Sequence, residues 1–175
     1  MLEELYTRNL VLEQESKVDE LTQIYNRRGF YDVANEMISR KDNEGRKLLV
    51  CYADMDNLKT VNDMFGHIEG DFSLKALANC MKELFGQDGV VGRMGGDEFV
   101  AVVFEDLVGG QTNVETQMKK IICQLNESVA KPYKIDMSMG IHPCFCLNAY
   151  DLKEAIDKAD DKLYAIKMER KRKIN

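Results

Sequence analysis

Apolar residues change their spacing along the chain in a way that separates helices from strands. From Asn26, a good helix N-cap, apolar side chains recur at helical spacing as far as Ser39. Residues 48–53 instead form a continuous apolar run that ends at Asp54, as a strand covered on both faces does. We therefore predict a helix over 26–39 followed by a central strand over 48–53.

The rest of the chain repeats this alternation. We expect a short helix over 58–65, a turn at 66–70 and a helix as far as residue 84. Residues 90–94 and 98–104 are strand-like and flank a glycine pair typical of a tight β-hairpin. A helix over 114–129, a strand over 135–142 and a last helix from about residue 151 to 168 follow. This order predicts an α/β or α+β fold, in which helices flank a central mixed sheet with one antiparallel hairpin.

Length and composition indicate one soluble domain. The chain has 175 residues, of which 45% are apolar and 31% are charged, as in ordinary globular proteins. Residues 1–18, with leucines at helical spacing, are predicted to be a helical linker or the end of a signalling helix before a domain over 19–175. A formal net charge of −6 argues against a nucleic-acid or anionic-membrane partner. A phosphate ligand would therefore need metal ions or local cations.

The cysteines and the absence of long apolar runs bear on the compartment. The five cysteines are odd in number, lack C-x-x-C spacing and lie mostly in apolar runs, which predicts reduced core residues. No signal peptide opens the chain, and no apolar stretch approaches the ~18 residues that a membrane span needs. We expect a cytoplasmic polypeptide, and a membrane-anchored parent protein is compatible with the same pattern.

Acidic residues gather at two predicted strand ends. Asp54 and Asp56 follow the apolar strand, where open α/β sheets bind ligands, and Asp97 and Glu98 stand at the hairpin tip. Each motif alone also fits an ordinary turn or helix cap. If the hairpin lies beside the 47–53 strand, three carboxylates converge. Such hard oxygen ligands suit Mg²⁺ bound jointly with substrate phosphates, the usual arrangement for attack at phosphorus.

The hairpin tip resembles the signature of GGDEF domains, the bacterial diguanylate cyclases. Residues 95–99 read Gly-Gly-Asp-Glu-Phe, and Arg93 stands two residues before them. Further blocks in the family's order extend the resemblance from residue 19 to 171, which is far more specific than a lone motif. These blocks lie at 19–22 with 25–28, at 54–59 with Asn62, Asp63, Gly66, His67, Gly70 and Asp71, at 138–140, and at 159–167.

The resemblance implies a palm-like cyclase domain that makes cyclic di-GMP from two GTP and releases two pyrophosphates. It implies that Asp54 and Asp97 bind Mg²⁺ with the backbone carbonyl of Met55, with two ions per site and Mn²⁺ as an alternative metal. Glu98 corresponds to a carboxylate that assists metal binding or activates the 3′-hydroxyl. Asn62 and Asp71 match the positions that recognise guanine. Adenine lacks the 2-amino group from which Asp71 would accept a hydrogen bond. The positions expected to bind GTP are Asn57, Leu58, Lys59, Asn62, His67, Asp71, Lys167 and Lys171, and for His67 a turn-capping role fits equally well.

Two departures from the family's pattern change these expectations. The usual Gly-Arg-Asn near the end is replaced by Arg170, Lys171 and Arg172, and we interpret the basic run over 170–173 as a solvated terminal segment. The inhibitory product site of many members, Arg-x-x-Asp, is replaced by Gly86 and Gly89. We therefore expect no inhibitory product site.

The resemblance also implies partners. A homodimer is expected during turnover, because each domain holds one GTP and each 3′-hydroxyl must meet the other's α-phosphorus. The N-terminal helix would pair the copies, and an upstream sensory domain is expected in the full-length protein. Two alternatives stay open, a catalytically silent GTP-binding signalling module and a cyclase with a mixed guanine–adenine product. The complete carboxylate set weighs against the first, and Asp71 weighs against the second.

Overall fold

The computed structural model describes residues 17–145 and 148–174, so the helix expected over 1–18 lies almost wholly outside the described residues. The strands are β1 (Tyr25–Asn26), β2 (Leu48–Met55), β3 (Gly89–Gly95), β4 (Glu98–Phe104) and β5 (Met137–Cys144). The helices are α2 (Arg27–Ser39), α3 (Leu58–Phe65), α4 (His67–Phe85), α5 (Glu105–Val108), α6 (Gln111–Val129) and α7 (Ala149–Ile174), with a 3-10 helix over Lys41–Asn43.

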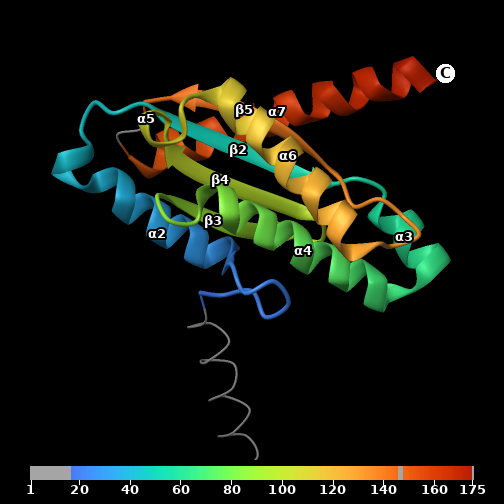
Figure 1. Cartoon of the computed structure of the whole chain (residues 1–175). Coiled ribbons are helices and arrows are strands. Elements are labelled where there is room, and N and C mark those ends of the chain that lie inside the picture. The colour runs from blue at the N-terminus through green and yellow to red at the C-terminus, as the bar shows by residue number, and fades with distance from the viewer. Residues whose placement is uncertain (1–16, 146–147, 175) are drawn as a thin grey trace, which may run out of the picture.

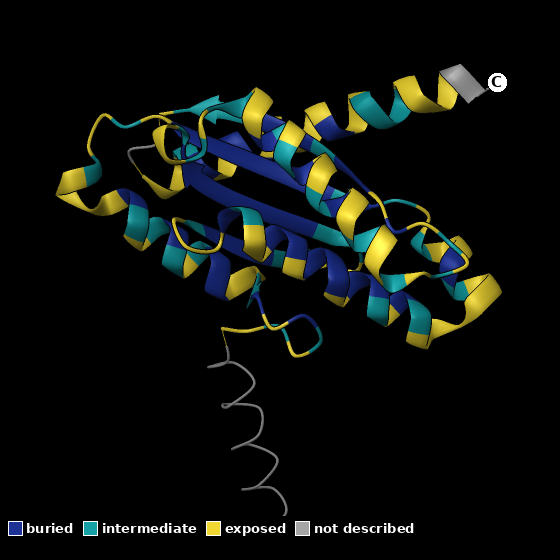
Figure 2. Ribbon diagram, viewed as in Figure 1, coloured by how far each residue is buried: buried dark blue, intermediate teal, exposed yellow. Residues whose placement is uncertain are grey.

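The strands form one mixed sheet in the order β1-β3-β4-β2-β5 (Figure 1). β2 lies between β4 and β5 and is antiparallel to both, whereas the short β1 runs parallel to β3. β3 and β4 pair as an antiparallel hairpin, which confirms the hairpin prediction. Every residue of β2 except Asp54 is buried (Figure 2), so the prediction of a central strand is also confirmed.

Helices cover both faces of the sheet because β2 is apolar on both sides. Leu49, Cys51 and Ala53 face one core cluster, which contains the buried side chains of α4 and α6. Leu48 and Val50 face the other cluster, which α2 and α7 cover. The expected mixed sheet flanked by helices is therefore confirmed.

Three sequence-based details are wrong. The segment 66–70 is not a turn, because Gly66 alone, with a φ of 92°, supplies the reversal and α4 begins at His67. The last helix is longer than expected and continues to Ile174. Cys51 and Cys80 are buried as predicted, but Cys123 is exposed on α6, and Cys146 lies outside the described residues.

Gly140 sets the distance between β5 and α7, and its replacement tests this packing. A Cβ atom there would lie 2.1 Å from the Ala159 carbonyl oxygen, so the helix backbone would have to move. We expect Gly140→Ala to lower the free energy of unfolding by about 1–3 kcal/mol in denaturant titrations. Gly95→Ala is the control, because nothing lies within 4 Å of the added carbon, and a change below about 0.5 kcal/mol is expected. Equal effects of both substitutions would contradict the packing argument.

Candidate active site

The antiparallel pairing of β2 with β4 brings the predicted carboxylates to one edge of the sheet. Asp54 lies directly opposite Glu98 in the register. Gly96, with a φ of 44°, and Asp97 connect β3 to β4, and the Met55 amide donates a hydrogen bond of 3.0 Å to the Asp97 carbonyl oxygen. The hairpin tip is thereby fixed to the end of β2, so the hairpin lies beside the strand that carries Asp54.

Arg93 holds this tip against the segment before β1. Its guanidinium donates to the Gly96 carbonyl oxygen at 2.6 and 3.0 Å and to the Asp19 carboxylate at 3.1 Å. Asp19 also accepts hydrogen bonds from the amide and hydroxyl of Thr22. Two sequence blocks that lie 74 residues apart are thus joined by one charge-assisted network.

Burial and neighbouring negative charges raise the pKa values of Asp54 and Glu98. Burial raises the pKa of Asp54, and the nearby charge of Asp97 raises it further, against the opposing effect of Lys167. Burial also raises the pKa of Glu98, followed by the charges of Asp160, Asp54 and Asp97, whereas the hydrogen bond with Tyr52 lowers it. This edge of the sheet therefore favours a cation.

The raised pKa of Glu98 predicts that the free energy of unfolding decreases as the pH rises. Because the folded protein holds the pKa of Glu98 above its ordinary value of 4.5, the stability that its protonated form contributes is present below that pH and is lost as pH rises through the folded pKa. We expect Glu98→Gln to raise the melting temperature at pH 7 and to leave it nearly unchanged at pH 4. Thermal unfolding at both values measures this, and a lower melting temperature of the variant at pH 7 would argue against it.

Asp54 already forms an ion pair with a lysine side chain in this structure. The Lys167 ammonium group on α7 contacts Asp54 Oδ1, and the Asp54 side chain is 17% exposed. Within the described part of the chain, no group of three His, Cys, Asp or Glu side chains is assembled that could hold a metal ion. The donor set of Asp54, Asp97 and the Met55 carbonyl is therefore incomplete, and it fits a hard cation that completes its coordination with water and phosphate oxygens.

A second ion pair lies beside the first and was missed from the sequence. Arg170 donates a hydrogen bond of 2.9 Å to Asp56 Oδ2, and the Ser138 hydroxyl donates one of 2.8 Å to Asp56 Oδ1. The interpretation of residue 170 as part of a solvated run is therefore wrong, although its side chain stays 50% exposed. Asp160, whose charge raises the pKa of Glu98, was also missed from the sequence. Its position in the block over 159–167 is the only feature of the sequence that points to it.

The candidate GTP-binding residues lie on the segment that follows β2, on α3 and α4, and on α7. The backbone of Asn57 is in the left-handed conformation, with a φ of 60°. It turns the chain into α3 directly after Asp54 and Asp56. A Cβ atom on Gly70 would lie 1.9 Å from Asn62 Oδ1, so α3 and α4 touch where Asn62 and Asp71 lie. Leu58 is half-buried and His67 lies in the first turn of α4. The exposed members of the set are Asn57, Lys59, His67, Asp71 and Lys171.

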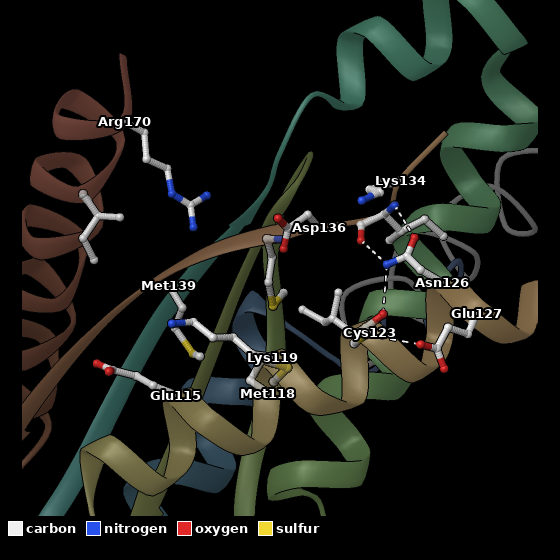
Figure 3. A pocket seen from close by; sticks show the side chains of 14 residues that line it. Glu115, Met118, Lys119, Cys123, Asn126, Glu127, Lys134, Asp136, Met139 and Arg170 are labelled. Atoms are coloured by element: carbon white, nitrogen blue, oxygen red, sulfur yellow. Dashed lines mark hydrogen bonds between the residues drawn. The ribbon is translucent and has the colours of Figure 1, made fainter. Parts of the chain in front are cut away.

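A separate cavity of about 790 Å³ lies between α6, β5 and α7 (Figure 3). Met118, Ile122 and Met139 contribute its apolar lining, and Arg170 and Asp136 stand at its border. Asp54, Asp97 and Glu98 do not line it. The carboxylate edge is thus separate from this cavity.

Comparison with known proteins agrees with this geometry. A family model described as diguanylate cyclase, GGDEF domain, matches residues 16–173. This chain belongs to the GGDEF family. A solved structure of a microbial GGDEF domain, described for its interaction with cyclic di-GMP, has a TM-score of 0.71 and 28% sequence identity and covers 89% of this chain and 95% of that one. The GGDEF fold is therefore shared over nearly the whole domain.

Curated relatives of this GGDEF domain are longer proteins. The diguanylate cyclase DgcP of Escherichia coli (strain K12) is 34% identical over 102 residues, which are 58% of this chain and 30% of that protein. The cyclic di-GMP phosphodiesterase PdeB of Shewanella oneidensis is 31% identical over 134 residues, or 74% of this chain and 15% of that protein. The chain thus spans less than a third of the length of either relative. Among the residues that the structure describes, no helix is long and apolar enough to cross a membrane.

Proposed function

We propose that this GGDEF domain is a diguanylate cyclase, which condenses two GTP into cyclic di-GMP and releases two pyrophosphates. The observation that carries the proposal is the placement of Asp54 on β2 directly opposite Glu98 on β4. Asp97 lies in the connection between β3 and β4, directly before Glu98. The family match supports the reaction class. A module that only holds a nucleotide has less use for the complete set of Asp54, Asp97 and Glu98.

We assign the metal to Asp54, Asp97 and the Met55 carbonyl, with Mg²⁺ as the expected ion and Mn²⁺ as an alternative. When bound, the metal would neutralise phosphate charge and favour in-line attack at the α-phosphorus. We assign to Glu98 the task of assisting this site or accepting the proton of the 3′-hydroxyl. Its raised pKa suits a group that exchanges a proton closer to neutral pH.

The triphosphate would lie over the turn between β2 and α3. The first amides of α3 and the side chain of Lys59 are suited to bind phosphate oxygens, because a helix N-terminus leaves unpaired N–H groups. On GTP binding, the Lys167 ammonium group would leave Asp54 and pair with the terminal phosphates. Lys171 is exposed on the same helix. Binding of GTP is thereby coupled to the release of an existing ion pair.

Asn62 and Asp71 are assigned to the guanine edge, and their replacement tests the choice of base. We expect Asp71→Ala or Asn62→Ala to lower the use of GTP by about ten- to a hundredfold, because each leaves a polar contact to guanine unmade. Any use of ATP should change far less, since adenine lacks the 2-amino donor of guanine. Initial rates with each nucleotide measure this. Equal losses for both would show that these residues maintain the fold rather than read guanine.

The reaction requires two copies of the domain, because one GTP is held in each and both 3′-hydroxyls must reach an α-phosphorus. A homodimer, at least during turnover, is therefore part of the proposal. Asp97 and Glu98 are only half-buried, which is compatible with a second copy facing them.

Product analysis separates the proposal from its alternatives. Incubation with GTP and Mg²⁺, followed by chromatography, is expected to yield cyclic di-GMP. Bound but unchanged GTP would indicate a silent signalling module, a possibility that deserves a test because one relative of this domain is named a phosphodiesterase. A mixed product in the presence of ATP would indicate a different cyclic dinucleotide synthase.

A further inference from the structure

Two cations on α7 face two acids at the end of β2. Lys167 and Arg170 are three residues apart and therefore lie on one face of the helix. Asp54 is in the last part of β2, and Asp56 follows directly after the end of the strand. Lys167 contacts Asp54, and Arg170 contacts Asp56 at 2.9 Å, so the helix is joined to the candidate active site by two adjacent ion pairs.

The second pair belongs to a closed network of three side chains. Arg170 NH1 donates both to Asp56 Oδ2 and to Ser138 Oγ, each at 2.9 Å, while the Ser138 hydroxyl donates to Asp56 Oδ1 at 2.8 Å. Ser138 is only 1% exposed and lies opposite Asp54 in the pairing of β2 with β5. The Asp56 amide also donates a hydrogen bond of 2.9 Å to the Asp136 carbonyl oxygen. Asp56 is therefore held through its backbone and its carboxylate.

Asp56 lies in the turn where the chain leaves β2 and enters α3. It separates Met55, the last residue of β2, from Asn57, whose left-handed backbone leads into α3. The conformation of Asp56 therefore sets how the first amides of α3 face the carboxylate edge. An unneutralised charge on Asp56 would also repel a triphosphate at this turn.

We propose that Arg170 is a positioning residue, which with Ser138 fixes Asp56 and neutralises its charge, and so shapes the turn over 54–59 for a nucleoside triphosphate. The inference rests on the proposed function only in taking GTP as the ligand. Figure 3 shows Arg170 extending from α7 toward the segment that carries Asp136.

Fold stability alone does not account for the network. The Arg170 side chain is 50% exposed and that of Asp56 is 18% exposed, so solvent screens the pair from the Arg170 side and reduces what it adds to the free energy of folding. Loss of Arg170 should therefore change nucleotide binding much more than it changes the melting temperature.

The test measures binding of a GTP analogue in which a methylene group replaces the α,β-bridging oxygen, so that no product can form. Calorimetric titration in Mg²⁺ is expected to give a Kd for Arg170→Leu about tenfold above that of the native chain, because Asp56 loses a charge-assisted contact and its charge is left unneutralised beside the triphosphate. Arg172→Leu removes the same charge from the same exposed segment and should change the Kd less than about twofold. Melting temperatures of both variants are measured alongside.

A double variant distinguishes positioning from general charge or folding effects. Adding Asp56→Asn to Arg170→Leu removes the unpaired charge and keeps an acceptor for Ser138, so the Kd should return to within about threefold of native. No recovery, or equal losses in Arg170→Leu and Arg172→Leu, would overturn the inference, and so would failure of the native chain to bind the analogue. If the native chain binds the analogue but forms no cyclic di-GMP from GTP, the proposed function fails while the Kd values still decide the role of Arg170.

Discussion

Alanine at Asp97 or at Glu98 is expected to lower cyclic di-GMP synthesis by at least about a hundredfold, the scale on which preorganised electrostatic groups act in catalysis. Both side chains are only half-buried at the tip of the hairpin and contribute little to packing. Asp97 is assigned to the metal, and Glu98 lies opposite Asp54. Initial rates with GTP measure the loss, and circular dichroism should show an unchanged fold.

Asp88→Ala provides the control for this loss. It removes an exposed carboxylate just before β3, away from the hairpin tip, and should retain near-native rates. Near-native turnover of Asp97→Ala or Glu98→Ala with unchanged Mg²⁺ dependence would show that the metal assignment is wrong. A partial rate with a raised Mg²⁺ requirement would instead assign the replaced residue a supporting role.

Added cyclic di-GMP is expected to inhibit the enzyme only weakly and in competition with GTP. Gly86 at the end of α4 and Gly89 at the start of β3 stand where the inhibitory arginine and aspartate would be. Each missing charge-assisted contact is worth ~1.5–3 kcal/mol, so the two together predict at least about a hundredfold weaker binding there.

The backbone around this position supports the same expectation. A Cβ atom on Gly86 would lie 2.4 Å from the Lys82 carbonyl oxygen, and one on Gly89 would lie 2.7 Å from that of Val102. Neither position accepts a side chain without a backbone shift. Initial rates across a series of product concentrations decide the matter. Strong inhibition that excess GTP cannot relieve would require a second product site built from other residues.

Local patterns were sufficient to predict the parts of the site that lie close in sequence. The apolar run before Asp54 and the glycine pair before Asp97 predicted a buried strand and a hairpin, and the structure pairs them with Asp54 opposite Glu98. The start of α4 was mispredicted because glycines at both 66 and 70 suggested a turn. Only Gly66 has a positive φ, whereas Gly70 allows Asn62 to approach α4.

Contacts between distant segments could not be predicted from such patterns. Arg170 and Asp56 are 114 residues apart, and nothing in a basic C-terminal run indicates which acid it faces. The continuous α7 brings Arg170 to Asp56 by the same helical geometry that brings Lys167 to Asp54. The pairing became visible only with the helix and the sheet placed together.

The central claim is that the carboxylates at the joined ends of β2 and β4 convert two GTP into one cyclic di-GMP. The most direct measurement is the ratio of pyrophosphate to cyclic di-GMP when the chain is incubated with GTP and Mg²⁺, with Glu98→Ala measured in parallel. We predict two pyrophosphates for each cyclic di-GMP from the native chain and neither product from the variant. Recovery of all the GTP unchanged from the native chain, although it binds the nucleotide, would contradict the claim.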